Sequence, residues 1–161
     1  MNMVVLGCGN PSRGDDGLGP ALMERVEGWI RQHPDYSVAA VEDFQFQVEH
    51  TLDLRGRDLI LFLDAAATGP DPFTLRTLAP ALDPGSSSHA LSPQALLQTF
   101  LALDFGAPPA AFALGVRGHD FALGSELSLK ARANLEAAWV LVERLLAAPS
   151  RSQWEGACTP D

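Results

Sequence analysis

The sequence predicts a single α/β domain whose mainly parallel or mixed, five-stranded twisted sheet carries helices on both faces. Three observations lead to this prediction. Residues 59–63 are consecutively apolar, as is typical of a central strand covered on both sides. Residues 18–32 and 128–148 carry apolar side chains at helical spacing, so each predicts a helix with one buried face. Predicted strands and helices alternate along the chain, and this order favours parallel pairing.

Local signals place the elements of the N-terminal half. Residues 3–6 are apolar and are followed by glycine, which indicates a buried first strand. The helix over 18–32 must end before Pro34, because proline breaks the hydrogen-bond ladder. Residues 36–41 then predict a second strand, and residues 47–54 a short helix or turn.

The C-terminal half contains two further strand signals and a capped helix. Residues 73–78 form a weaker strand candidate, and residues 111–116 predict a last buried strand. Ser92 and Pro93 are typical of a helix start, with serine as the N-cap and proline in the first turn. That helix is expected to reach about residue 103.

The domain is expected to span residues 1–148. No internal repeat or change of composition marks a second domain. Residues 149–161 are polar and lack periodicity, so they are predicted to form a loose C-terminal tail.

Composition excludes several classes of function. The formal net charge of −9 and the pI near 4.7 argue against binding to nucleic acid or to an anionic membrane surface. The two cysteines, Cys8 and Cys158, have no partner at metal-site spacing and do not suggest a disulfide framework. The N-terminus lacks a signal-peptide pattern, and no apolar run reaches the roughly 18–20 residues of a membrane helix. The expectation is a soluble cytoplasmic protein.

A glycine-rich loop at residues 7–19 follows the first strand and contains Gly-x-Gly, which raises the possibility of dinucleotide binding. Two features count against it. The third glycine of that fingerprint would fall at Ser12, and Asp15 and Asp16 stand where the helix N-terminus would have to attract a pyrophosphate. We expect one of the two carboxylates to cap the helix and the other to point into a crevice.

Further candidates lie at the carboxyl ends of other strands, where α/β sheets bind their ligands. Asp64 directly follows the apolar strand at 59–63. His119 follows the last strand and His89 precedes the helix at Ser92, so position alone does not separate them. Two carboxylates and a histidine suit nickel, zinc or a similar divalent ion with open positions, although an Asp–His pair could equally be an acid/base couple.

The pattern Gly-x-Gly-Asn-Pro-x-x-Gly-Asp-Asp-Gly-x-Gly at residues 7–19 resembles the signature of the hydrogenase maturation endopeptidases. The order of the later features agrees with this resemblance over residues 3–146. It comprises an apolar strand ending in Asp64, a serine-rich stretch, a histidine before a helix, and Gly-x-x-Leu-Ser before the closing helix.

This resemblance implies a function and a site. Members of the family remove a C-terminal peptide from the large-subunit precursor of [NiFe]-hydrogenase after nickel has been inserted. Matched by position, their metal-binding trio corresponds to Asp16, Asp64 and His89, which selects His89 over His119. The trio is implied to recognise nickel carried by the substrate, and no tightly bound organic cofactor is expected. A nickel-sensing chaperone of the same fold that does not cleave is the alternative.

One segment departs from the common family pattern. Many members carry a glycine-rich stretch after the second strand, whereas residues 42–50 read Glu-Asp-Phe-Gln-Phe-Gln-Val-Glu-His. The glutamine-rich sequence resembles the branch that serves cytoplasmic NAD-reducing or bidirectional hydrogenases. An ordinary loop and helix start is an equally good interpretation of it.

Overall fold

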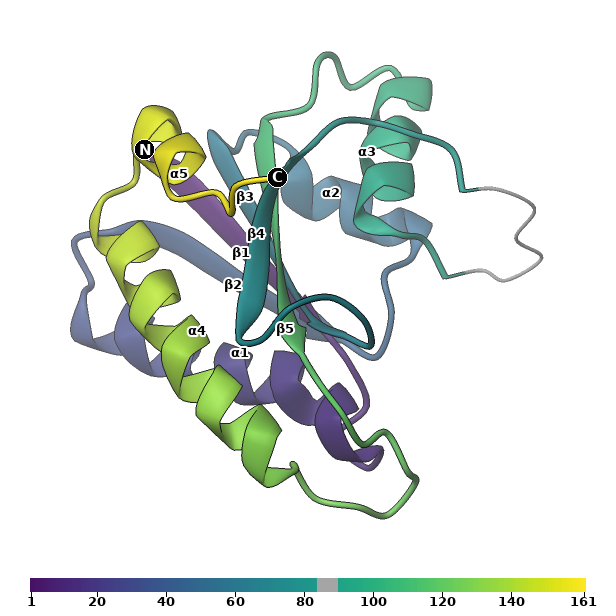
Figure 1. The fold of residues 1–161 in the computed structure, drawn as a ribbon. Helices are drawn as coiled ribbons and strands as arrows, with labels where there is room; N and C mark the ends of the chain where they lie inside the picture. Colours follow the sequence, from purple (N-terminus) through teal and green to yellow (C-terminus); the bar gives the residue numbers. More distant parts are fainter. Residues whose placement is uncertain (84–89) are drawn as a thin grey trace.

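The computed structural model describes residues 1–83 and 90–161, and a five-stranded sheet forms its centre (Figure 1). The strands lie in the order β2 (Ser37–Asp43), β1 (Asn2–Cys8), β3 (Leu59–Ala66), β5 (Ala110–Arg117) and β4 (Phe73–Leu78). β4 runs antiparallel to β5, and the other pairs are parallel. The predicted single domain with a mainly parallel or mixed sheet is therefore confirmed.

Helices cover both faces of the sheet. On one face lie α1 (Leu18–Gln32) and α4 (Leu129–Ala147), and on the other α2 (Thr51–Leu54) and α3 (Pro93–Ala102) (Figure 1). Short 3-10 turns, η1 (Gly14–Gly17) and η2 (Val48–His50), precede α1 and α2, and α5 (Arg151–Gly156) follows α4. Among the described residues, no helix is both long enough and apolar enough to cross a membrane.

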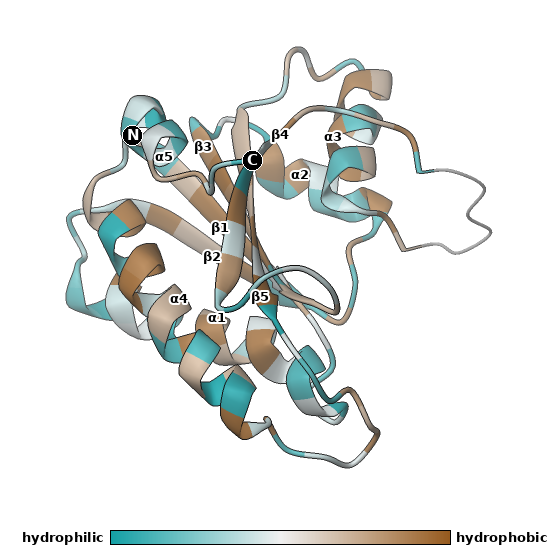
Figure 2. Cartoon of the chain, in the orientation of Figure 1, coloured by the Kyte–Doolittle hydropathy of each residue, from teal (hydrophilic) through white to brown (hydrophobic). Residues whose placement is uncertain are grey.

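Strict alternation along the central strands builds two hydrophobic cores. Met3 and Val5 of β1 pack under α1 and α4, whereas Val4 and Leu6 face α2 and α3. β3 alternates in the same way, and the apolar colour along the strands in Figure 2 reflects this burial on both sides. Because side chains alternate with period two, the last side chains of β1 and β3 also point alternately toward one core and the other. Cys8 is thereby buried in the core beneath α2 and α3.

The helix ends follow the predicted signals. Ser92 and Ser128 are the N-caps of α3 and α4, and each hydroxyl accepts a hydrogen bond from a backbone N–H three residues on. α1 ends at Gln32, directly before His33, whose ring stacks on Trp29 and whose Nδ1 contacts the carbonyl of Trp29. His33 is thus a structural residue at the end of the helix.

The prediction of a loose C-terminal tail is wrong. Residues 151–156 form α5, which begins at the N-cap Ser150. The Trp154 side chain is completely buried, its Nε1–H donates to the carbonyl oxygen of Leu145 at 2.9 Å, and its ring packs edge-on against Phe112. Beyond α5, the N–H of Thr159 donates to the carbonyl of Leu75 in β4. A helix of two turns is too short to show periodicity, so one buried tryptophan fixes the tail without a sequence pattern.

Candidate active site

The path of the chain creates a crevice between β1 and β3. From the carboxyl end of β1 the chain passes through α1 to β2 on one side, whereas from the carboxyl end of β3 it continues to β4 and β5 on the other side. The connections therefore diverge at the carboxyl ends of β1 and β3. In open α/β sheets this divergence is where ligands bind.

A cleft of about 320 Å³ occupies this position. It is lined by Cys8, Gly9, Asp16, Phe44, Gln45, Phe46, Asp64, Ala90, Leu91, Ser92 and Pro93. One wall is fixed by a backbone hydrogen bond of 2.9 Å from the N–H of Leu91 to the carbonyl of Phe46. The structure thus brings together two predicted site residues, Asp16 and Asp64, that are far apart in the sequence.

Asp64 occupies a partly buried position at the end of β3. Burial raises the pKa of its carboxyl to about 6, and the negative charge of Asp16 acts in the same direction. Hydrogen bonds from the N–H of Ala65, at 2.7 Å, and from the thiol of Cys8 oppose part of this increase. The cleft therefore contains a carboxyl that gives up its proton only near neutral pH.

The raised pKa of Asp64 predicts a pH-dependent stability. Between about pH 4 and pH 6 the unfolded chain loses this proton before the folded one, so the stability contributed at low pH is lost as the pH rises. Asp64→Asn removes this effect. The variant's free energy of unfolding in urea should exceed that of the metal-free wild type by on the order of 2 kcal/mol at neutral pH and by little near pH 4. A difference independent of pH would contradict this assignment.

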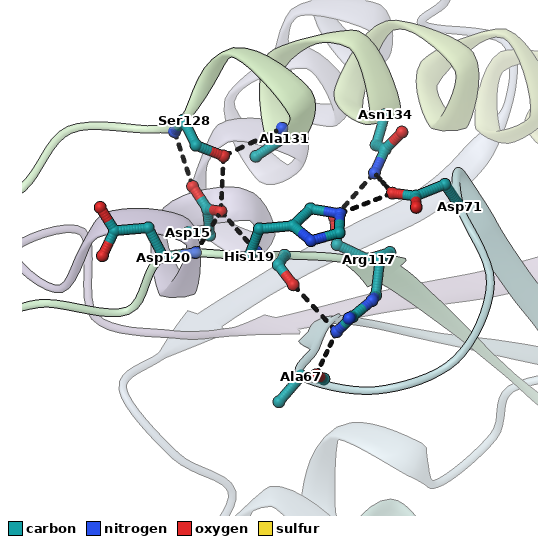
Figure 3. Close-up of polar contacts among 10 residues, drawn as sticks. Asp15, Ala67, Asp71, Arg117, His119, Asp120, Ser128, Ala131 and Asn134 are labelled. Carbon is teal, nitrogen blue, oxygen red and sulfur yellow. Dashed lines mark hydrogen bonds and ion pairs between the residues drawn. The ribbon is translucent and has the colours of Figure 1, made fainter.

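The two adjacent carboxylates of η1 point in different directions. Asp16 lines the cleft, and its Oδ2 accepts a hydrogen bond of 2.6 Å from the N–H of Asn10. Asp15 has no exposed surface and binds the loop between β5 and α4, where it meets Ser128, the N-cap of α4 (Figure 3). The prediction that one carboxylate enters the crevice fits this arrangement. The prediction that the other carboxylate caps the following helix, α1, does not fit, because Asp15 lies at the N-terminus of α4.

Two glycines of the first loop are required by the chain's own packing. Gly9 has φ +147°, and a Cβ there would lie 2.1 Å from the carbonyl oxygen of Asp16. Gly14 has φ +55°, and its Cβ would lie 2.4 Å from the carbonyl oxygen of Asp120. Both conformations favour glycine. Both glycines are therefore explained by the close packing of one loop against another. A bound dinucleotide is not needed to explain them, and this weakens the dinucleotide interpretation further.

Solved structures share this architecture. A hydrogenase maturation protease HycI from Thermococcus kodakarensis matches with TM-score 0.68 and 20% identity over 91% of this chain and 92% of its own. The maturating endopeptidase HybD from E. coli matches with TM-score 0.69 and 18% identity over 93% and 94%. An endopeptidase from Escherichia coli, solved in solution, matches with TM-score 0.70 and 21% identity over the same shares. The chain has the fold of the hydrogenase maturation proteases. No family model and no curated protein matches the sequence.

Within this maturation-protease fold, the third predicted metal ligand, His89, lies outside the described residues. Among residues 1–83 and 90–161, no group of three or more His, Cys, Asp or Glu side chains is placed to hold a metal ion. The described part of the cleft contributes the carboxylates of Asp16 and Asp64. The roles of all three residues stay predictions.

The competing histidine, His119, has structural partners. Its Nε2 lies 2.7 Å from Oδ1 of Asp71, which also accepts a hydrogen bond of 2.7 Å from Nδ2 of Asn134 (Figure 3). The hydrogen bond with His119, followed by that from Asn134, lowers the pKa of Asp71. This network joins the β3–β4 connection to α4, and His119 is not among the residues that line the cleft.

The glutamine-rich segment forms part of the cleft. Phe46 is almost fully buried against Phe62 and His50, which fixes the segment, whereas Phe44 is 69% exposed at the cleft. Gln47 begins η2 in a capping box with His50, whose Nδ1 accepts a hydrogen bond of 2.8 Å from the N–H of Gln47. Sequence reasoning did not name Phe44 and Gln45 as site residues. The alternation of phenylalanine and glutamine would place Phe44 and Phe46 on one side, so it gave no signal for an exposed Phe44 beside a buried Phe46.

Cys8 also lines the cleft, but its chemistry does not suit a nucleophile. Burial, together with the charge of Asp64 and the hydrogen bond to it, raises the pKa of the Cys8 thiol well above its usual range. We expect Cys8→Ala to process its substrate within about threefold of the wild-type rate, and iodoacetamide to leave Cys8 of the native protein unmodified at pH 8. Complete inactivity of a folded Cys8→Ala variant would instead indicate thiol chemistry.

Proposed function

We propose that this protein is an endopeptidase that removes the C-terminal extension of a [NiFe]-hydrogenase large-subunit precursor after nickel insertion. One observation carries the proposal: Asp16 and Asp64 line the same cleft at the divergence point of a fold shared with hydrogenase maturation proteases. The resemblance of residues 7–19 to the signature of that family supports it independently of the fold.

The donor set of the cleft fits a divalent cation that arrives with the substrate. Two carboxylates provide oxygen ligands, and His89, by resemblance, would add an imidazole nitrogen. The raised pKa of Asp64 shows that its charge is poorly compensated in the free protein. A cation bound there would replace the proton and neutralise this charge, so the cleft favours a nickel-loaded precursor over an empty one.

Among the described residues of the cleft, the hydroxyl and thiol groups do not favour a covalent intermediate. The Cys8 thiol is held protonated, and the Ser92 hydroxyl bonds the carboxylate of Asp83 and the N–H of Ala95 at the start of α3. Attack by water fits better. Nickel held next to the scissile bond would supply Lewis acidity to the carbonyl or to the attacking water. Asp16, Asp64 and His89 would orient that nickel.

The alternative is a chaperone of the same fold that senses nickel without cutting. Both functions require the cleft, but only the protease changes the mass of its partner. The protein should be incubated with its host's large-subunit precursor, with and without nickel, and the products read by intact mass. Loss of a defined C-terminal peptide from the nickel-loaded form alone supports the protease. A nickel-loaded precursor that binds yet stays intact supports the chaperone.

We further propose a cytoplasmic protein that serves an NAD-reducing or bidirectional hydrogenase. The resemblance of residues 42–50 to that branch supports this assignment. Phe44 and Gln45, which line the cleft, would then contact the precursor.

A further inference from the structure

A buried carboxylate that the proposed reaction does not use lies beside the cleft. Asp15 has no exposed surface, yet its side chain accepts four hydrogen bonds (Figure 3). The donors are the N–H groups of His119 at 2.7 Å, Asp120 at 2.9 Å and Ser128 at 2.7 Å, and the hydroxyl of Ser128 at 2.7 Å. All of them belong to the connection between β5 and α4, more than a hundred residues away along the chain.

These donors keep Asp15 ionised. Burial acts to raise the pKa of its carboxyl, but the hydrogen bonds outweigh burial and hold the pKa below its ordinary value. Ser128 is the N-cap of α4, a helix of 19 residues, so the positive end of the helix dipole also faces this charge. A fully hydrogen-bonded charge of this kind fixes both segments that it joins.

Backbone hydrogen bonds reinforce the same junction. The N–H of Asp15 donates to the carbonyl of Asp120 at 2.7 Å, and the N–H of Gly14 donates to the carbonyl of Ser125 at 3.0 Å. Together with the Asp15 carboxylate, these bonds form what we call the latch between η1 and residues 119–128. The latch thus ties η1 to a segment, residues 119–128, that is not among those that line the cleft.

Asp16 is the next residue in η1, and its side chain enters the cleft rather than the latch. Its Oδ2 accepts the hydrogen bond from the N–H of Asn10 while its side chain lines the cleft. η1 spans only four residues, so a shift of Asp15 must rotate Asp16. We propose that Asp15 is a positioning residue: the latch fixes η1 so that Asp16 faces Asp64 across the cleft. This proposal rests on the proposed function and concerns the same cleft.

A positioning role differs measurably from a contribution to stability alone. A change in stability lowers the fraction of folded molecules and leaves the kcat of each folded molecule unaltered. A misplaced Asp16 lowers kcat in the folded molecules, while KM for the precursor stays near the wild-type value. The Asn10 amide provides a second readout, because its hydrogen bond to Asp16 reports the place of that carboxylate without any reaction.

The test uses Asp15→Asn, which keeps the volume but turns one acceptor oxygen into a donor that faces N–H groups. Asp71→Asn is the matched control, because it weakens the neighbouring His119 network and leaves the latch in place. Amide hydrogen exchange of Asn10 is measured by NMR, with Asp16→Ala defining full loss of the bond. Steady-state kcat and KM are measured on nickel-loaded precursor, under conditions where urea titrations show every variant folded.

We expect Asp15→Asn to raise the exchange rate of the Asn10 amide at least about tenfold and to lower kcat by roughly 10- to 100-fold. Asp71→Asn should stay within about twofold of wild type in both. A folded Asp15→Asn protein with a protected Asn10 amide and wild-type kcat overturns the proposal. If Asp15→Asn does not fold, Ser128→Ala is measured instead, because it removes one of the four hydrogen bonds to Asp15. It should show smaller changes in the same direction. An unchanged exchange rate and an unchanged kcat in Ser128→Ala would overturn the proposal. Failure of the wild type to cleave would refute the proposed function, and the Asn10 amide would still decide the role of Asp15.

Discussion

Asp64→Asn and Asp16→Asn are each expected to lower the rate of precursor processing by at least roughly 100-fold while the protein stays folded. This is the scale observed when one group that stabilises transition-state charge is removed. Both carboxylates line the cleft, and asparagine keeps their volume while removing the charge that would hold the cation. The measurement is single-turnover cleavage of nickel-loaded precursor, read by intact mass. His89→Ala is expected to behave in the same way.

Asp35→Asn is the matched control, because it removes an exposed carboxylate that precedes β2 at the opposite end of the sheet. It should process at the wild-type rate. Asp64→Asn should at the same time be more stable than wild type at neutral pH, since a poorly compensated charge is removed. Lost activity combined with gained stability would separate a functional defect from unfolding. Cleavage at the wild-type rate by folded Asp16→Asn and Asp64→Asn variants would remove both residues from the mechanism.

Trp154→Ala is expected to destabilise the protein by about 3–5 kcal/mol, the usual cost of removing a large buried aromatic side chain. Trp154 is completely buried, packs against Phe112 and donates a hydrogen bond to Leu145, so truncation leaves a cavity and removes that bond. Urea unfolding, followed by circular dichroism, measures the change in the free energy of unfolding.

Gln153→Ala on the same short helix is the control for this effect, because the Gln153 side chain is exposed. It should change the free energy of unfolding by less than about 0.5 kcal/mol. A loss below about 1 kcal/mol in Trp154→Ala would show that α5 contributes little to the core. Since α5 packs far from the cleft residues, a folded Trp154→Ala protein should retain its processing rate.

The strongest sequence signals predicted the central fold well, because they are local consequences of burial. The apolar run at 59–63 became β3, and the helical spacing over 18–32 became α1 with the same bounds. Ser92 and Ser128 cap their helices as expected, since an N-cap depends on a few neighbouring backbone groups. The prediction of a loose C-terminal tail failed because the burial of Trp154 depends on contacts with β5 and α4, and these contacts are not visible in the sequence of the tail itself.

The candidate site likewise could be predicted from the sequence only in part. Ligand binding at the carboxyl ends of strands is a general property of parallel sheets, so the Asp15–Asp16 pair and Asp64 could be selected as neighbours before their cleft was known. The resemblance to the family then selected Asp16 from that pair. The choice of His89 over His119 came from resemblance, and His89 lies outside the described residues. The structure adds that His119 is bound to Asp71, a contact over 48 residues that no local pattern predicts.

The sequence by itself determined the strands, the main helices, the glycine-rich loop and the two carboxylates that could enter a crevice. The residues themselves did not decide which of two adjacent aspartates does so; the family resemblance selected Asp16, and only the tertiary structure gives the physical reason. Asp15 and Asp16 are chemically identical, and their difference arises because the N-terminus of α4 offers buried N–H groups to one and the cleft leaves the other beside Asn10. Such partners come together only when distant segments pack, because hydrogen bonding and desolvation depend on the surroundings of a side chain and not on its place in the sequence.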